Sequence, residues 1–135
     1  MARVLIVEDD SELRQVIGYA LMDMGVACEE ASNGKEALEA LCRTTGAGEK
    51  FDCVLLDILM PGGMDGWAVL EAIRKNPLWL DLPVVVLTGK ATLPAEVERA
   101  RRLGAAHIQK TARFVDDVTA KVGELLGGTG EPETA

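Results

Sequence analysis

A chain of 135 residues, of which 48% are hydrophobic, is long enough for one domain with a buried core and short for two. The formal net charge of −8 argues against general nucleic-acid binding, because contacts with a phosphate backbone need a basic surface. The apolar runs are far shorter than a membrane span, and the start MARVLIVEDD lacks the long apolar region of a signal peptide, so no membrane partner is expected.

The cysteines indicate the compartment. Cys28, Cys42 and Cys53 are odd in number and form no C-x-x-C pair. This usage predicts reduced thiols in the core of a cytoplasmic protein, rather than a disulfide framework or a zinc site.

The first half of the chain alternates between apolar runs and amphipathic segments. Residues 4–7 form a compact apolar run, which predicts a strand buried on both faces. Apolar residues at helical spacing from Leu13 to Met24 predict a helix that stops at Gly25. Residues 26–31 are a weaker strand candidate, and the apolar residues within 37–41 mark a second helix.

The second half repeats this alternation and ends in a polar tail. The tail, residues 128–135, has no apolar face, so we expect it to be flexible. The predicted elements before the tail are strands at 54–56, 84–87 and 105–109 and helices around 69–73, 97–103 and 114–126.

Five strands that alternate with five helices predict an α/β fold: a doubly wound parallel sheet, covered on both sides by helices, in a single domain. Ligands bind such sheets at the carboxyl ends of the strands. Reactive side chains follow or end four of the predicted strands: Glu8, Asp9 and Asp10 after the first, Asp57 on the third, Thr88 on the fourth and Lys110 on the fifth.

Each of these residues alone has a simpler role available. Asp10 or Ser11 suits the N-cap of the first helix, Thr88 a loop hydroxyl and Lys110 a solvated surface charge. Together they favour a binding site, because three carboxylates in one cleft repel one another unless a cation lies among them. Oxygen ligands of this kind suit Mg²⁺, which also binds phosphate, and Lys110 and Thr88 suit contacts with phosphoryl oxygens.

Four motifs carry a resemblance to a known family. VLIVEDD, VLLDILMP, VVLTG and HIQK occur in this order at the predicted strand ends. Through them, residues 3–127 resemble the receiver domain of the two-component response regulators, in particular the stand-alone receivers of chemotaxis. The resemblance implies a flavodoxin-like sheet of order 2-1-3-4-5 and a receiver domain over residues 1–127.

The resemblance also implies a phosphoacceptor. Asp57 is expected to accept a phosphoryl group from a phosphohistidine on a sensor histidine kinase or a histidine phosphotransfer protein. Thr88 and Lys110 are expected to contact that phosphoryl group. The domain would then be no enzyme in the ordinary sense, because it would catalyse only its own Mg²⁺-dependent phosphorylation and dephosphorylation.

The family pattern implies a metal site around the same aspartate. Mg²⁺ is expected to bind Asp57 and Asp9 directly, Glu8 through water, and the backbone carbonyl of Leu59. Three carboxylates, one Mg²⁺ and Lys110 sum formally to zero charge before phosphate arrives, so the metal is expected to be required.

Three departures from the family pattern affect the expected site. The loop of residues 60–66 is one glycine longer than the usual M-P-G-M-D-G, and Asp65 within it is a candidate cap for the third helix. Lys110-Thr111 replaces the usual Lys-Pro, and we expect a trans bond, because a cis bond before a non-proline residue costs about 2.5–4 kcal/mol. His107, the only histidine, occupies the switch position that usually holds tyrosine or phenylalanine, and is expected to act with Thr88.

The signal is expected to leave through the fourth helix, the fifth strand and the fifth helix. This surface is predicted to be basic in an otherwise acidic protein, which suits an acidic downstream protein or a second copy of the domain in a homodimer. Direct contact with nucleic acid is not expected. The predicted basic patch consists of Arg99, Arg101, Arg102, Arg113 and Lys121.

Two other functions stay open. A degenerate receiver would act as a phosphorylation-independent interaction module, and the longer loop and the missing proline motivate this alternative. A phosphatase of the haloacid dehalogenase type would use an aspartyl-phosphate intermediate, but that class has a second acid two residues after the nucleophile, where this chain has Leu59. The start Met1-Ala2-Arg3 favours an N-terminal or stand-alone receiver over one excised from a larger regulator or hybrid kinase.

Overall fold

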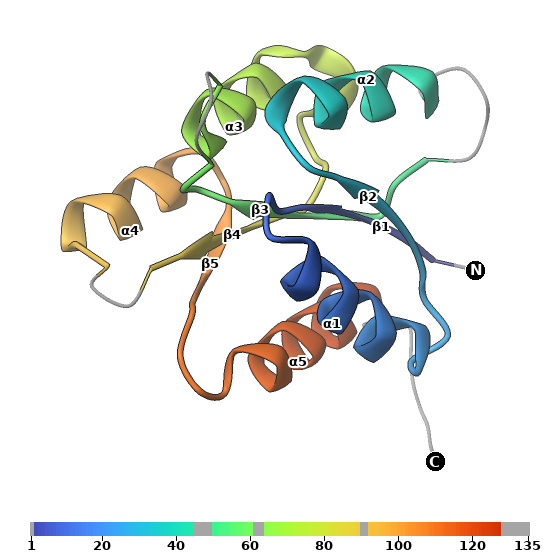
Figure 1. The fold of residues 1–135 in the computed structure, drawn as a ribbon. Helices are drawn as coiled ribbons and strands as arrows, with labels where there is room; N and C mark the ends of the chain where they lie inside the picture. The colour runs from blue at the N-terminus through green and yellow to red at the C-terminus, as the bar shows by residue number, and fades with distance from the viewer. Residues whose placement is uncertain (1, 45–49, 61–63, 90–91, 128–135) are drawn as a thin grey trace.

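The computed structural model of the protein describes residues 2–44, 50–60, 64–89 and 92–127. It contains one sheet of five parallel strands in the order β2-β1-β3-β4-β5, which confirms the predicted flavodoxin-like α/β fold (Figure 1). The strands are β1 (Arg3–Val7), β2 (Ala27–Ala31), β3 (Cys53–Asp57), β4 (Val84–Thr88) and β5 (Ala106–Gln109). The helices are α1 (Ser11–Met22), α2 (Gly34–Thr44), α3 (Gly66–Lys75), α4 (Pro94–Arg102) and α5 (Phe114–Gly127), with a short 3-10 helix η1 (Pro77–Trp79) after α3.

The sheet is buried on both faces, which explains the continuous apolar runs of its central strands. On β1, Leu5 and Val7 point toward the core under α2, α3 and α4, whereas Val4 and Ile6 point toward the core under α1 and α5. The two layers of helices lie on opposite sides of the sheet in Figure 1. Because both faces of the central strands β1, β3 and β4 are covered, these strands have no polar alternation, as the sequence predicted, whereas the edge strand β2 alternates between exposed and less exposed residues.

Helix ends follow the local capping chemistry. Asp10 caps α1, since its side chain accepts hydrogen bonds from the backbone amides of Glu12 and Leu13, and Asp65 caps α3 through the amide of Ala68. Both caps confirm predictions. The first helix ends at Met22, two residues earlier than predicted, and Gly25 lies in the following turn with φ of 81°.

The cysteine prediction is wrong for two of the three residues. Cys53 is buried on β3, but Cys28 and Cys42 are exposed, and the three form no disulfide. Cys28 lies on β2, which is an edge strand, and Cys42 lies on the outer side of α2. The hydrophobic character of cysteine therefore did not predict the burial of Cys28 and Cys42. Their burial depends on which side of each element faces the core.

The connection after α3 was not predicted. There η1 buries Trp79, and the Arg74 guanidinium donates to the carbonyl oxygens of Leu82 (2.8 Å) and of Leu103 (2.7 Å). These bonds tie the end of α3 to the segment before β4 and to the end of α4. Burial lowers the pKa of Arg74.

Several expectations concern particular bonds or segments. Every peptide bond of the described ranges is trans, including Lys110–Thr111, as predicted. The extra glycine of the loop (residues 62–63) and the polar tail (residues 128–135) lie outside the described residues. Among the helices that the structure describes, none has the length and apolarity to cross a membrane.

Candidate functional site

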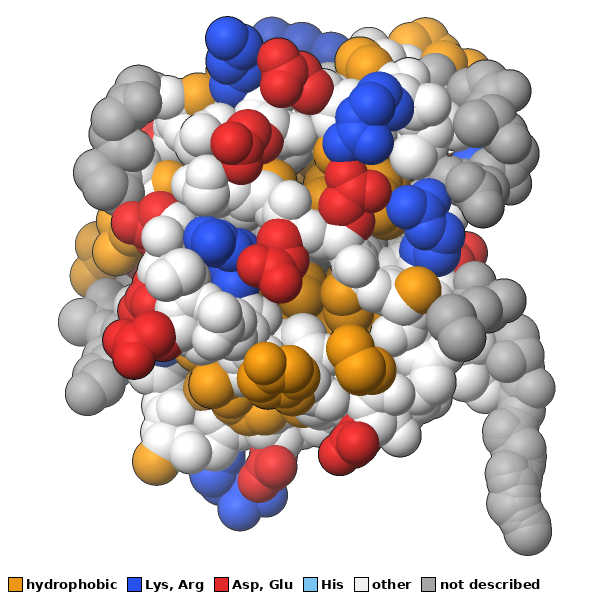
Figure 2. Space-filling view, turned by 45° about the vertical axis from the view of Figure 1, so that its right-hand side comes forward, with side chains coloured by type: hydrophobic (Ala, Val, Ile, Leu, Met, Phe, Trp, Pro, Cys, Tyr) orange, Lys and Arg blue, Asp and Glu red, His pale blue; other side chains and the backbone are white. Residues whose placement is uncertain are grey.

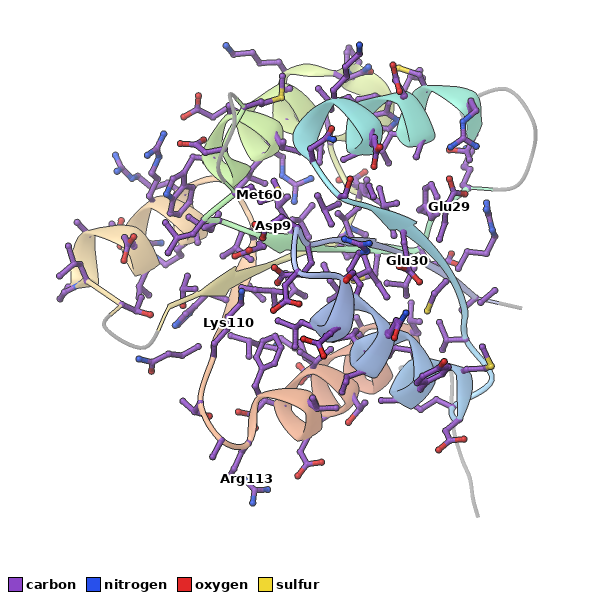
Figure 3. All side chains as sticks on the ribbon, viewed as in Figure 1. Asp9, Glu29, Glu30, Met60, Lys110 and Arg113 are labelled. Carbon is purple, nitrogen blue, oxygen red and sulfur yellow. The ribbon has the colours of Figure 1, made fainter. Side chains whose placement is uncertain are left out.

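The carboxyl ends of four strands bring the predicted reactive residues together. Asp57 ends β3 and lies beside Leu87 of β4, and the amide of Lys110 donates to the carbonyl of Thr88 (2.9 Å) where β4 and β5 end. Glu8 follows β1 directly, and its amide continues the sheet by donating to Ala31 O (3.1 Å). Figure 3 shows Asp9 and Lys110 at this edge of the sheet. Parallel pairing thus assembles a site from residues far apart in the sequence.

Three carboxylates form the centre of the site. Glu8, Asp9 and Asp57 each offer an oxygen, and these oxygens lie within 4.8 Å of one another. Glu8 is 1% exposed and Asp57 2% exposed, whereas Asp9 is exposed at the rim. An all-oxygen set that combines buried charge with one solvent-facing carboxylate suits a small divalent cation that keeps some of its waters. The donor set therefore fits Mg²⁺.

Lys110 supplies the positive charge of the cluster. Its Nζ atom lies 3.0 Å from Glu8 Oε1 and 3.2 Å from Asp57 Oδ1. Burial by itself lowers the pKa of Lys110, but its hydrogen bond to Glu8 and the charges of Asp57 and Glu8 outweigh that effect and raise it. Lys110 thus stays protonated and can donate to an oxygen that approaches Asp57.

The surroundings of Glu8 strongly favour its protonated form. Burial, followed by its hydrogen bond with Asp57, raises the pKa of Glu8 to about 8, although Lys110 acts in the opposite direction. By formal charge, the one ammonium group of Lys110 does not balance three ionised carboxylates. A divalent cation would supply the missing positive charge.

The backbone around Asp57 is tightly packed. Leu59 donates its amide to Asp57 Oδ1 (3.2 Å), which brings the Leu59 backbone next to the cluster, while its side chain is 69% exposed. Gly66 begins α3 against the same strand end: a Cβ atom on Gly66 would lie 2.3 Å from Asp57 O. The Gly66 amide donates to Ile58 O (3.1 Å). This role of Gly66 was not predicted, although the Asp65-Gly66 pair after the loop was a signal for it.

Thr88 is buried beside the carboxylates. It is 2% exposed, its Oγ1 lies 2.7 Å from Thr92 Oγ1, and it also donates to Ile108 O (3.4 Å). The sequence did not lead us to predict that Thr92 is the partner of Thr88. The available signal was a second hydroxyl residue four positions after Thr88. His107 precedes Ile108 on β5 and is exposed, so in this structure its ring does not fill space beside Thr88.

The predicted basic patch is largely paired with acids. Arg99 forms an ion pair with Glu71 (2.7 Å), and its guanidinium lies 4.6 Å from the ring centroid of Trp67. The other two pairs of the patch are Arg101 with Glu98 and Lys121 with Glu124. The charge that this surface offers to a partner is therefore smaller than the count of Arg and Lys suggested, because acidic residues one helical turn away or on α3 neutralise it.

Comparisons with known proteins agree with this geometry. The sequence matches the response regulator receiver domain family over residues 4–118. It is 38% identical over 120 residues to the DNA-binding transcriptional regulator NtrC of Escherichia coli, a match that covers 88% of this chain and 24% of that protein. It is also 37% identical over 90 residues to the sensor histidine kinase CheAY of Helicobacter pylori, covering 66% of this chain and 11% of that one. The chain thus spans a quarter or less of the length of these relatives.

Two solved structures have the same fold. The chemotaxis protein CheY4 of Vibrio cholerae superposes with a TM-score of 0.79 at 27% identity, covering 93% of this chain and 99% of that one. The response regulator TrrA of Thermotoga maritima, solved in complex with Mg²⁺-BeF, superposes with a TM-score of 0.77 at 29% identity, covering 93% of this chain and 100% of that one.

Proposed function

Because the chain belongs to the response regulator receiver domain family, we propose that Asp57 accepts a phosphoryl group from a phosphohistidine of a sensor histidine kinase or a histidine phosphotransfer protein. The observation that carries the proposal is the cluster itself: three carboxylates with oxygens within 4.8 Å, and Lys110 at 3.2 Å from Asp57. Signalling then proceeds in the cytoplasm through protein contacts that depend on the phosphorylated state.

The transfer is a displacement at phosphorus. A carboxylate oxygen of Asp57 attacks the phosphorus atom, an O–P bond forms, and the P–N bond to the donor imidazole breaks. The imidazole nitrogen leaves with the electron pair, and the product is an acyl phosphate on Asp57. The chain contributes position and charge, because loose transition states of this kind need little covalent chemistry from the protein.

The residues around Asp57 have distinct roles in this step. Leu59 N–H and Lys110 Nζ both contact Asp57 Oδ1, which fixes the carboxylate, and Lys110 can donate to the incoming phosphoryl oxygens. Mg²⁺, held by Asp57, Asp9, Glu8 through water, and the Leu59 carbonyl, would neutralise carboxylate and phosphoryl charge. Thr88 supplies a hydroxyl donor one strand away.

Asp57→Asn tests the proposal, because an amide is not a nucleophile. Incubating the protein with a small phosphodonor and Mg²⁺ should add the mass of one phosphoryl group to the intact wild type and none to Asp57→Asn. Asp81→Asn is the matched control, since Asp81 is an exposed aspartate after η1, and it should be labelled like the wild type. Unfolding midpoints should show that both variants are folded.

Two results would contradict the proposal in different ways. Labelling of Asp57→Asn at the wild-type level would place the phosphoacceptor elsewhere. A wild type that gains no phosphoryl group would instead favour the degenerate receiver that acts as a phosphorylation-independent module.

A further inference from the structure

Arg14 lies in the first turn of α1, next to the carboxylate cluster but outside it. Its Nη1 atom donates to the backbone carbonyl of Glu8 at 2.6 Å, and its Nε atom donates to Glu30 Oε1 at 2.9 Å. Its side chain is only 16% exposed. Glu30 belongs to the edge strand β2, where Figure 3 labels it, so the guanidinium connects the loop after β1 to the neighbouring strand.

The other charged side chain of this strand takes part in ion pairs between side chains. Glu29, next to Glu30, pairs with Arg3 and with Arg43, and Figure 2 shows acidic and basic side chains interleaved over this side of the molecule. The pair with Arg43 is exposed, and exposed pairs of this kind contribute little to stability. Arg14 differs from them because one arm of its guanidinium reaches a backbone atom of the acidic loop.

The carbonyl that Arg14 holds belongs to the peptide group between Glu8 and Asp9. A peptide group is planar, so a hydrogen bond that fixes its carbonyl also fixes the direction in which the chain enters Asp9. On the far side of Asp9, the amide of Asp10 donates to Glu8 Oε2 at 3.3 Å. Both peptide groups that flank Asp9 are thus anchored.

Asp9 depends on this anchoring more than the other two carboxylates do. Glu8 and Asp57 are buried and both contact Lys110. Asp9 is exposed, and within the described part of the chain its carboxylate accepts no hydrogen bond. Because no side-chain hydrogen bond fixes it, its place in the cluster depends on the direction in which the backbone points its Cα–Cβ bond.

We propose that Arg14 is a positioning residue for Mg²⁺ binding: it holds the peptide group between Glu8 and Asp9 so that the Asp9 carboxylate faces Glu8 and Asp57. The inference rests on the proposed magnesium site. Arginine suits the task because its planar fork serves two acceptors at fixed angles, one on the loop and one on β2, whereas the ammonium of lysine is a single point of charge.

If Arg14 is replaced, loss of its charge and loss of its positioning role should change the Mg²⁺ affinity in opposite directions. A guanidinium near the site repels a dication, so its removal in Arg14→Met would tighten Mg²⁺ binding if charge alone mattered. Loss of positioning would weaken binding instead. Groups that orient metal ligands typically contribute about tenfold or more to affinity, so we expect Arg14→Met to weaken Mg²⁺ binding by about tenfold.

Calorimetric titration of Mg²⁺ into the chelator-treated full chain gives the dissociation constants. Arg14→Lys keeps the charge but not the fork, and it should also bind Mg²⁺ more weakly than the wild type. Arg43→Met is the matched control, because Arg43 pairs with Glu29 on the same strand at 2.6 Å but extends from α2. It should bind Mg²⁺ as tightly as the wild type or slightly tighter.

A second readout uses the metal-free protein. In the presence of chelator, the backbone amides of Asp9 and Asp10 should exchange with solvent faster in Arg14→Met than in the wild type, while amides of the central strands stay protected. Affinity of both Arg14 variants equal to or tighter than wild type would overturn the positioning role and leave the metal site intact. Failure of the wild type to bind Mg²⁺ would overturn the metal site and this inference with it.

Discussion

Glu8 combines near-complete burial with two neighbouring carboxylates. Its side chain is 2% exposed, and its carboxylate forms an ion pair with Lys110 at 3.0 Å. Burial disfavours the charged form of an acid, and the hydrogen bond with Asp57 acts in the same direction, so the pKa of Glu8 rises from 4.5 to about 8. The unfolded chain has no such environment, and folding therefore takes up a proton at Glu8 between these two pH values.

This uptake predicts that the metal-free protein loses stability as pH rises. Between about pH 4.5 and 8 the folded state holds the Glu8 proton and the unfolded state does not, so the free energy of unfolding falls with pH. One proton gives a slope of at most about 1.4 kcal/mol per pH unit. Lys110 does not contribute to the change of stability between pH 4.5 and 8, because its pKa is raised from 10.5 and therefore lies above this range in both states.

Urea unfolding in chelator at pH 5.5 and at pH 8 measures the effect. Glu8→Gln carries no titrating group, so its stability relative to the wild type should rise between the two pH values. Glu36→Gln is the control, since hydrogen bonds from Ser32 lower the pKa of Glu36 and it does not titrate in this window. Parallel curves for Glu8→Gln and the wild type would refute the assigned ionisation.

At the scale of elements, the site depends on how α3 begins against β3. The third strand ends at Asp57, and nine residues later α3 begins at Gly66, so close to the strand end that a Cβ atom on Gly66 would clash with the backbone of Asp57 and Ile58. Asp65 caps the helix at this point through the amide of Ala68 (2.9 Å). The same packing contacts therefore fix the position of Asp57 and the start of α3.

Gly66→Ala should disturb both the position of Asp57 and the start of α3. The added Cβ atom would lie 2.3 Å from Asp57 O and 2.6 Å from Ile58 Cα, and these are backbone atoms that cannot rotate away. Forced overpacking of this kind typically costs about 1–3 kcal/mol, and we expect at least that loss in urea unfolding together with slower phosphorylation.

Gly18→Ala is a matched control within α1. The nearest atom to its added Cβ is Ile6 Cδ1 at 4.0 Å, which is ordinary contact, and alanine is the better helix former by about 1 kcal/mol. This variant should be as stable as the wild type or more so, with unchanged phosphorylation. Equal losses in the two variants would show that the Gly66 contact has no special role.

At the scale of the whole molecule, the site lies at one edge of a sheet that has helices packed on both faces. We expect a change at Asp57 to reach the surface through the neighbouring strands β4 and β5 and the helix between them. Thr88 ends β4, and its hydroxyl rests between Thr92 and the carbonyl of Ile108. A phosphoryl group brings roughly −1.5 to −2 charge and strong acceptors, which would compete for this hydroxyl.

We therefore predict that phosphorylation changes the backbone amide signals of residues 92–114 more than those of residues 37–41. Thr88→Ala should still accept the phosphoryl group but show a reduced response in residues 92–114. The response needs only a shift between two existing conformations.

Thr92→Ala provides the comparison, because it removes the partner of Thr88 and leaves the Thr88 hydroxyl in place. It should keep the full response. A complete response in Thr88→Ala would rule out Thr88 as the relay, and with it the predicted role of His107.

The residues alone predicted the alternation of strands and helices, both caps and the sheet edge that carries Glu8, Asp57, Thr88 and Lys110. These features depend on local periodicity, on side chains that bond their own backbone, and on the rule that parallel strands end at one edge. The finer roles of the site residues came from the resemblance to the receiver family.

Tertiary structure decided the contacts between elements. Four features depend on which faces of two distant segments meet. They are the exposure of Cys28, the ion pair of Arg99 with Glu71, the hydrogen bonds of Arg14 to Glu8 and Glu30, and the close approach of Gly66 to Asp57. Periodicity shows which side of a helix is apolar, but it does not show which atoms of another element lie opposite. Those neighbours, and the burial that raises the pKa of Glu8, exist only once the sheet and its helices are packed together.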